Sequence, residues 1–116
     1  MVQPDRIQGI DRGQMKINGV DRLRSFEKAH SVARRPLSRW CSVVRGARWS
    51  NFAEVRETFG NASPAKLASG ENVVIFNIGG NKFRWVAFVQ YQTGLVVVGK
   101  VLTHAEYDTD KWKDEL

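Results

Sequence analysis

Cysteine is nearly absent from this chain of 116 residues, which contains only Cys41. One cysteine excludes an internal disulfide and any metal site built from several thiolates, and it fits the reducing conditions of the cytosol. No hydrophobic run approaches the ~20 residues that a membrane-spanning helix needs. The opening residues also lack the apolar core of a signal peptide. These absences predict a cytoplasmic protein without a thiolate-based metal centre.

Positive charge is in excess, because 18 Lys and Arg residues stand against 12 Asp and Glu residues, for a net charge of +6. The charges within residues 1–14 cancel, so the excess lies in residues 15–116. Such an excess attracts polyanions, with nucleic acid as the first candidate. The charge balance leaves DNA, RNA and an acidic protein partner open, together with a basic protein that binds none of them.

The length predicts one domain with one hydrophobic core. We expect this domain at residues 15–116 and a flexible extension at residues 1–14, with Met15 as an alternative start. Residues 15–20 predict a short strand, and residues 21–30 a helix capped by Asp21.

A second helix is predicted with Pro36 in its first turn. Its apolar residues recur at the i, i+3, i+4, i+7 spacing of one buried face, which places Cys41 in the core. They are Leu37, Trp40, Cys41 and Val44. A third helix is predicted over residues 50–60, with Asn51 as its N-cap and Glu54 as the capping-box partner.

The second half of the chain predicts strands at residues 72–78, 82–92 and 95–102, which are rich in β-branched and aromatic residues. Short glycine-containing connections join them, so an antiparallel meander is expected. Residues 61–72 are expected to form a loop. The predicted fold class is α+β, with N-terminal helices packed on one face of a curved antiparallel sheet.

The middle strand alternates between two kinds of face. Phe83 and Trp85 begin an apolar set that the helices should cover, whereas Lys82 and Arg84 begin a set that is cationic at one end and apolar at its centre. Lys100 in the next strand points the same way as His104 if that strand extends so far.

The stretch "THAEYD" at residues 103–108 follows the last strand. Cleavage of RNA by its own 2′-hydroxyl requires a proton-transferring group beside cations that stabilise the charge on the phosphate. His104, Glu106, Tyr107 and Asp108, with Lys82 and Arg84 on the neighbouring strand, supply these groups without a metal or cofactor. The alternative is structural: a polar turn in which Tyr107 covers the sheet and Asp108 caps a short C-terminal helix.

The segments "VIFNIGGNKFRWVAFV" and "THAEYD" together resemble the HigB family of toxins from type II toxin–antitoxin modules, which have the RelE/ParE-like fold. The similarity extends over most of residues 15–116. It implies a ribosome-dependent mRNA endonuclease that attacks through the 2′-hydroxyl without a metal, leaves a 2′,3′-cyclic phosphate and inhibits translation. It also implies neutralisation by a HigA-type helix-turn-helix antitoxin, through which alone the toxin would reach operator DNA.

The resemblance also implies roles for individual residues. His104 is the candidate general acid or base, Lys82 and Arg84 are candidates for phosphate binding, and Tyr107 and Asp108 complete the catalytic set. Asn81 in the same motif is an RNA-binding candidate, and we add Lys100 as a second one. Gly99 departs from the family pattern, which often has an arginine at that position.

Two other functions remain possible. ParE-like relatives on the same fold inhibit DNA gyrase by protein contact and cleave nothing. Retention of a histidine beside a lysine and an arginine favours the nuclease, because an inhibitor of that kind does not need to transfer protons. A structural or DNA-binding module is the third possibility, and the sequence contains no convincing helix-turn-helix of its own.

Overall fold

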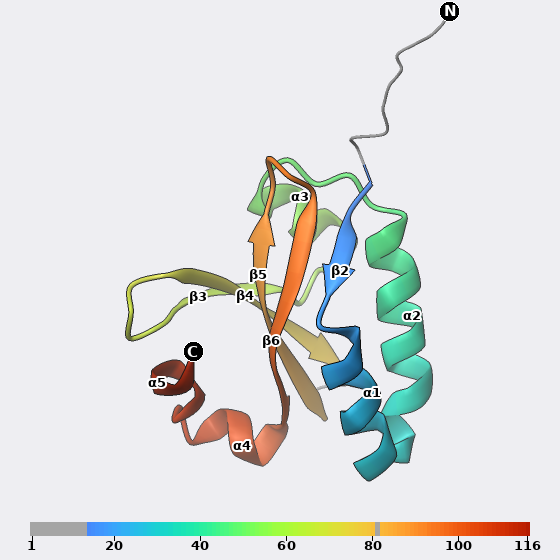
Figure 1. The fold of residues 1–116 in the computed structure, drawn as a ribbon, viewed down its shortest axis with the longest axis vertical. Coiled ribbons are helices and arrows are strands. Elements are labelled where there is room, and N and C mark those ends of the chain that lie inside the picture. The colour runs from blue at the N-terminus through green and yellow to red at the C-terminus, as the bar shows by residue number, and fades with distance from the viewer. Residues whose placement is uncertain (1–13, 81) are drawn as a thin grey trace, which may run out of the picture.

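A five-stranded sheet forms the centre of the computed structural model, with strand order β2-β6-β5-β4-β3 (Figure 1). The structure describes residues 14–80 and 82–116. The sheet strands are β2 (Lys16–Asn18), β3 (Ser63–Lys66), β4 (Asn72–Ile78), β5 (Phe83–Gln90) and β6 (Leu95–Thr103). The helices are α1 (Val20–Ala29), the 3-10 turn η1 (Ser31–Ala33), α2 (Arg34–Arg45), α3 (Phe52–Thr58), α4 (His104–Asp108) and α5 (Trp112–Glu115). Most of the predicted extension, residues 1–13, lies outside the described residues.

The predicted antiparallel meander is confirmed for β4, β5 and β6. Gly79 and Gly80 in the connection between β4 and β5 have φ angles of 64° and 65°, which favour glycine over any residue with a side chain. The sheet as a whole is mixed, because β2 pairs with the first part of β6 in parallel. Strand β2 is shorter than the predicted segment 15–20.

The expected loop at residues 61–72 is wrong in part, because Ser63–Lys66 pairs with β4 in antiparallel orientation. This strand lacks the β-branched and aromatic residues that mark strands in a sequence. It lies at the edge of the sheet, where the missing N–H of Pro64 is tolerated. Tertiary pairing with β4 therefore forms a strand where local sequence predicts none.

Helix α1 begins earlier than predicted, and the capping role expected for Asp21 is wrong. Gly19 occupies the N-cap with a φ of 92°, and Asp21 lies in the first turn. A Cβ at residue 19 would lie 3.0 Å from the carbonyl oxygen of Val98, so close packing of the chain against β6 also requires glycine there. The N-terminal cap of α3 is closer to expectation, because the Asn51 side chain accepts from the Glu54 N–H. The Glu54 carboxylate in turn accepts from the Ser50 N–H.

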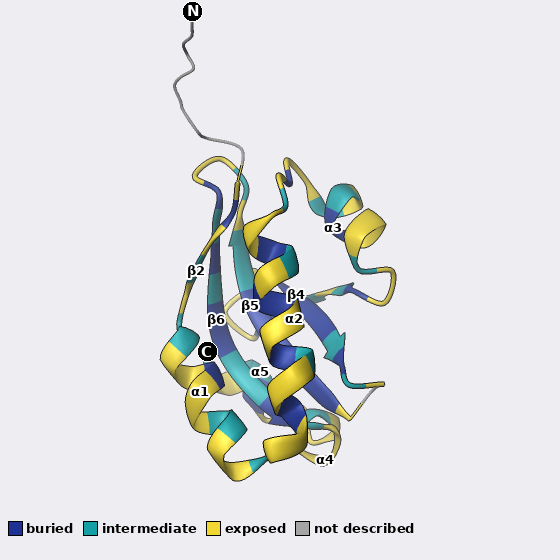
Figure 2. Cartoon of the chain, turned by 90° about the vertical axis from the view of Figure 1, so that its right-hand side faces the viewer, coloured by how far each residue is buried: buried dark blue, intermediate teal, exposed yellow. Residues whose placement is uncertain are grey.

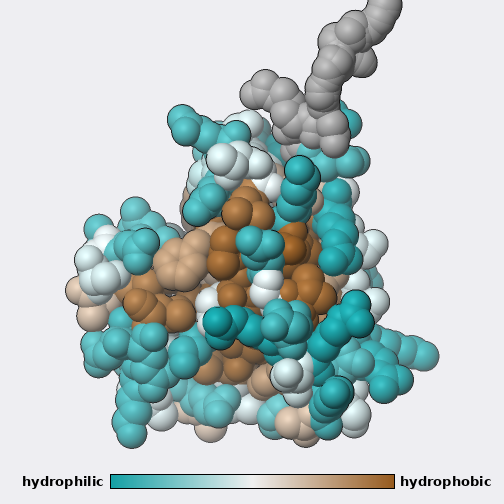
Figure 3. All heavy atoms as spheres, in the orientation of Figure 1, coloured by the Kyte–Doolittle hydropathy of each residue, from teal (hydrophilic) through white to brown (hydrophobic). Residues whose placement is uncertain are grey.

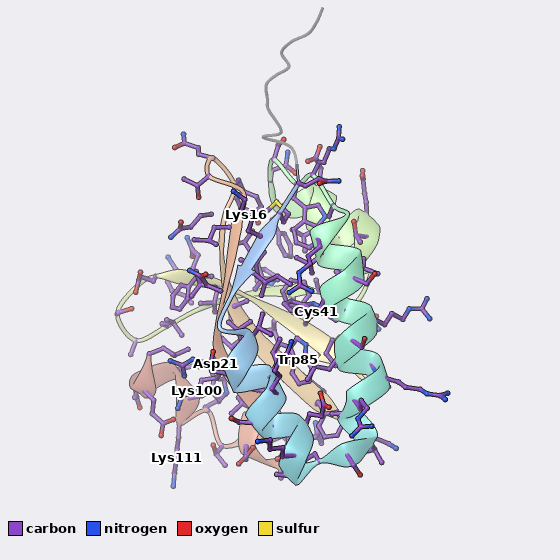
Figure 4. All side chains as sticks on the ribbon, turned by 45° about the vertical axis from the view of Figure 1, so that its right-hand side comes forward. Lys16, Asp21, Cys41, Trp85, Lys100 and Lys111 are labelled. Atoms are coloured by element: carbon purple, nitrogen blue, oxygen red, sulfur yellow. The ribbon has the colours of Figure 1, made fainter. Side chains whose placement is uncertain are left out.

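The main core lies between the helical half and one face of the sheet, as predicted. Figure 2 shows α2 in front of the strands, with buried residues toward the sheet and exposed residues toward the viewer. Trp40 and Trp85 are 1% and 0% exposed, and Cys41 is buried on the same stripe of α2. Figure 4 places Trp85 and Cys41 between α2 and the strands. This layer, consisting of α1, η1 and α2, is called the helical layer below.

The opposite face of the sheet has a second, smaller core that the sequence did not predict. Its members come from the strands, from the loop after β3 and from α5: Leu67, Val73, Ile75, Val86, Leu102 and Trp112. In Figure 3 hydrophobic side chains gather over the strands on this side, between the C-terminal helices and α1. Helices α4 and α5 therefore cover part of this face, which is called the C-terminal face below. Within the described residues no helix has the length and hydrophobicity to cross a membrane.

Candidate active site

The register of β5 and β6 brings the two predicted polar segments together. Phe83 pairs with Thr103, and the N–H of His104 donates to the carbonyl of Lys82 at 3.0 Å. Lys82 precedes the first residue of β5, and His104 begins α4 directly after β6. The end of one strand and the start of the next thus fix the two segments side by side.

The His104 ring contacts a cation on one side and a carboxylate on the other. Its Nδ1 lies 3.3 Å from Nη2 of Arg84, and its Nε2 lies 3.4 Å from Oδ2 of Asp108. A guanidinium has only donors, so this contact uses the Nδ1 lone pair and leaves the proton of a neutral imidazole on Nε2. Nε2–H then points to Asp108 at the exposed end of the ring. The predicted neighbourhood of Arg84 and His104 is confirmed.

Arg84 is far more buried than a residue on an open sheet face, with 8% of its surface exposed. Its Nη1 donates to the carbonyl of Phe83 at 3.3 Å, and its Cζ lies 5.1 Å from the centre of the Tyr107 ring. A guanidinium at this distance from an aromatic face is attracted by the ring quadrupole. Tyr107 therefore covers Arg84 and supports the cation that contacts His104.

Helix α4 positions His104, Tyr107 and Asp108 within little more than one turn. The Thr103 hydroxyl accepts from the Glu106 N–H at 3.2 Å, and the Glu106 carboxylate accepts from the Thr103 N–H at 2.9 Å. This capping box satisfies two otherwise unpaired donors. Glu106 is thus a structural residue. The spacing of four puts His104 and Asp108 on one side of the helix.

The remaining candidates are more dispersed. Lys82 is exposed in the turn before β5, although it was expected within the strand. Lys100 faces the C-terminal helices, where Figure 4 shows it, and its Nζ lies 2.8 Å from Oε1 of Glu115. Its described ion pair is with Glu115 and not with His104. Asn81 lies outside the described residues. Asp108 ends α4 and does not cap α5, whose N-cap position is Lys111.

The position of Gly99 has a structural explanation. The register between β5 and β6 shifts there, because Val86 pairs with Lys100 but Ala87 pairs with Val98. A Cβ at residue 99 would lie 3.1 Å from Cδ1 of Leu116 and 3.3 Å from the ring of Phe88. In this chain the C-terminal residues occupy the space that an arginine side chain would need.

Two groups outside the site have perturbed acidity. Burial raises the pKa of the Cys41 thiol, an effect that the nearby Arg45 and Arg24 guanidiniums partly oppose. Burial also raises the pKa of the Tyr91 hydroxyl. A thiol with a raised pKa is a poor nucleophile, which agrees with a packing role for Cys41. Among the described side chains, no three or more His, Cys, Asp and Glu residues gather as a metal site would require.

The excess charge does not lie on the candidate site. Residues 20–48, which contain the helical layer, carry seven arginines and one lysine against Asp21 and Glu27, and so account for a net charge of +6. The net charge of the whole chain is also +6. The rest of the chain, including the C-terminal face, is therefore neutral overall.

The helices on one side of a five-stranded, largely antiparallel sheet form an α+β structure of the RelE-like type. Residues 33–110 match the HigB_toxin family, described as the RelE-like toxic component of a toxin-antitoxin system. The match spans more than half of the chain and includes β4, β5, β6 and α4, so the chain belongs to the HigB toxin family. It is the toxin of a toxin–antitoxin system, and toxins of such systems have an antitoxin as their partner. No individual curated protein matches the chain.

Proposed function

We propose that this toxin is an endoribonuclease that cleaves mRNA on the ribosome by metal-independent attack of a 2′-hydroxyl. The observation that carries the proposal is the contact of His104 with Arg84 on one side and Asp108 on the other. A proton-transferring group beside a fixed cation is the combination that this reaction needs. Membership of the RelE-like toxin family supports the same reaction class.

In the proposed reaction, the 2′-oxygen attacks the adjacent phosphorus while its proton passes to a base. The bond from phosphorus to the 5′-oxygen breaks, an acid protonates that oxygen, and a 2′,3′-cyclic phosphate forms. His104 exchanges a proton with one of the two reacting oxygens, and Asp108 orients its Nε2. Lys82, which is exposed beside His104, binds the phosphate.

Arg84 acts from beneath the site. It orients the imidazole through Nδ1, and its charge stabilises the negative charge that develops on the phosphate. Tyr107 supports the guanidinium with its ring. For Asn81 and Lys100 an RNA-binding role stays a prediction; the ion pair with Glu115 would have to open before Lys100 could contact RNA.

We further propose that a HigA-type antitoxin neutralises the toxin and that the ribosome presents the mRNA. Free toxin should then degrade naked RNA poorly. Induced expression in cells with pulse labelling tests the function directly. A rapid fall in protein synthesis supports the nuclease, whereas a DNA-damage response with continuing synthesis would support inhibition of gyrase instead.

Substitutions identify the site in the same assay. His104→Ala and Arg84→Ala should each relieve growth arrest while antitoxin binding persists. His30→Phe is the matched control, because it removes the other histidine and keeps a ring against Phe26, where the ring centroids are 4.4 Å apart. Full toxicity of the His104→Ala/Arg84→Ala double variant would refute the assignment.

A further inference from the structure

Trp112 is a buried aromatic residue that the catalytic motif does not include. It is the first residue of α5 and is 2% exposed. Its indole N–H donates to the carbonyl oxygen of Tyr107 at 3.0 Å. Its ring is also stacked on the Tyr107 ring, with centroids 5.4 Å apart and planes 15° apart. One side chain therefore fixes both the backbone and the ring of Tyr107.

These contacts connect Trp112 to the proposed proton-transferring group. Tyr107 lies against the Arg84 guanidinium, and Arg84 donates to Nδ1 of His104. The Tyr107 ring thus contacts both Trp112 and the Arg84 guanidinium. A change at Trp112 that releases Tyr107 should therefore alter the orientation of Arg84 and the protonated nitrogen of His104.

The short length of α4 makes such support necessary. A helix of five residues forms too few internal hydrogen bonds to be stable in isolation. The capping box of Thr103 and Glu106 fixes its beginning, whereas Trp112 binds the carbonyl of Tyr107 near its end. The two ends of α4 are thus secured by different means.

The segment that carries Trp112 is itself attached to β6 and to the loop after β3. The carbonyl of Lys113 accepts from the Ala68 N–H at 3.1 Å, and Glu115 pairs with Lys100. Leu116 packs over Gly99 in the space described above. Trp112 is therefore a rigid support and not the end of a loose tail.

We propose that Trp112 is a positioning residue of the site, which through Tyr107 and Arg84 keeps His104 in the tautomer with its proton on Nε2. Its contribution to cleavage rests on the proposed function, whereas its control of the His104 tautomer does not. Residues that position catalytic groups affect the rate of the chemical step more than substrate binding, because they act on geometry.

The tautomer can be measured without any activity. The protein is labelled with 15N at histidine, carries His30→Phe so that His104 is its one remaining histidine, and is purified without antitoxin. NMR then gives the shifts of the two His104 ring nitrogens. We expect the Nε2–H tautomer in the parent protein. Trp112→Leu, which removes both the stack and the N–H donor, should convert it to a mixture with Nδ1–H.

Two comparison variants separate positioning from stability. Val73→Ala truncates a residue of the same core that is 2% exposed and lies on β4, away from the chain segment of α4. It should lower stability and leave the tautomer unchanged. Trp112→Phe keeps a ring against Tyr107 and loses only the N–H donor, so it should keep the parent tautomer. It remains informative if Trp112→Leu does not fold.

Cleavage of a reporter mRNA during translation in vitro supplies the second readout. Trp112→Leu should lower the maximal rate ~10–100-fold, the range expected for a misplaced catalytic group, with little change in the toxin concentration for half-maximal rate. Val73→Ala should cleave at the maximal rate of the parent protein, at temperatures at which the variant is folded.

An unchanged His104 tautomer in Trp112→Leu would overturn the proposal, whatever the cleavage rates. A mixed tautomer in Trp112→Phe would also contradict it, because the stack is retained there. If the parent protein cleaves no RNA, the proposed function fails, and the tautomer measurement still decides the role of Trp112.

Discussion

The two sides of the sheet differ in both packing and charge. The helical layer covers one side with the larger core and carries the equivalent of the whole net charge of +6 in residues 20–48. The C-terminal face has a small core around Trp112 and balanced charges, yet it contains the contact between His104 and Arg84. General attraction for polyanions and the proposed chemistry therefore lie on separate surfaces.

This separation limits what net charge says about a site. A uniform cationic surface attracts a phosphate backbone at long range but provides no proton transfer. The candidate site needs a single cation at a fixed distance from an imidazole, and Arg84 meets this need by being buried under Tyr107. Local geometry, rather than excess charge, distinguishes the C-terminal face.

The largest expected effect concerns the core beneath the helical layer. Trp85 is fully buried and lies 5.8 Å from Phe26 of α1 between ring centroids. Trp85→Ala should lower the free energy of unfolding by ~3–5 kcal/mol, measured by urea denaturation. Val32, which is 65% exposed in η1, gives the contrast. Val32→Ala should change the free energy of unfolding by less than ~0.5 kcal/mol. Equal losses would contradict the described packing.

A matched pair of exposed cations compares the two sides for activity. Lys82→Ala on the C-terminal face should reduce cleavage of a translated reporter mRNA ~10²–10³-fold, the usual loss for one group that stabilises a transition state. Arg39→Ala on α2 removes the same charge from the opposite side and should leave the chemical step near that of the parent. A larger loss of cleavage for Arg39→Ala than for Lys82→Ala would place the chemistry on the helical layer and contradict the account.

Polyanion binding should show the reverse preference. Replacing Arg35, Arg39 and Arg45 by serine removes three exposed charges from the helical layer. This variant should elute from heparin at clearly lower salt, since phosphate-like contacts depend steeply on ionic strength. Replacing Lys66, Lys111 and Lys113 by serine removes three charges from the part of the chain that is neutral overall and should have a smaller effect. Equal shifts would show that the charge asymmetry does not govern binding.

The smallest effect is expected for the ion pair of Lys100 and Glu115. Their side chains are 31% and 53% exposed, so solvent screens the attraction. A double-mutant cycle with Lys100→Gln and Glu115→Gln should give a coupling of ~0.2–1 kcal/mol that decreases with salt. A much larger coupling would mean that this pair, and not Trp112, fastens the C-terminal segment.

Much of the fold could be predicted from periodicity. The stripe of Leu37, Trp40, Cys41 and Val44 identifies α2, and alternation along β5 separates Trp85 from Arg84. Strand β3 could not be predicted, because Ser-Pro-Ala-Lys has no local preference for a strand and forms one by pairing with β4. The parallel pairing of β2 depends likewise on contacts between residues distant in sequence.

The site was predicted in part. The position of Arg84 in one predicted strand and of His104 at the end of the next indicated that the two would meet, and they do. The contact of His104 with Asp108 follows from a helix that begins at residue 104, where the sequence suggested only the end of a strand. Trp112 gave no usable signal, because one aromatic residue in a charged segment does not reveal which ring it covers.

The central claim is that the scissile phosphate lies on the C-terminal face. A structure of the toxin on a translating ribosome with mRNA methylated at the 2′-oxygen, which blocks the attack, would test it most directly. We predict that the blocked phosphate lies between the Lys82 ammonium and Nε2 of His104. A phosphate seated against the arginines of α2, with His104 away from the RNA, would contradict the account.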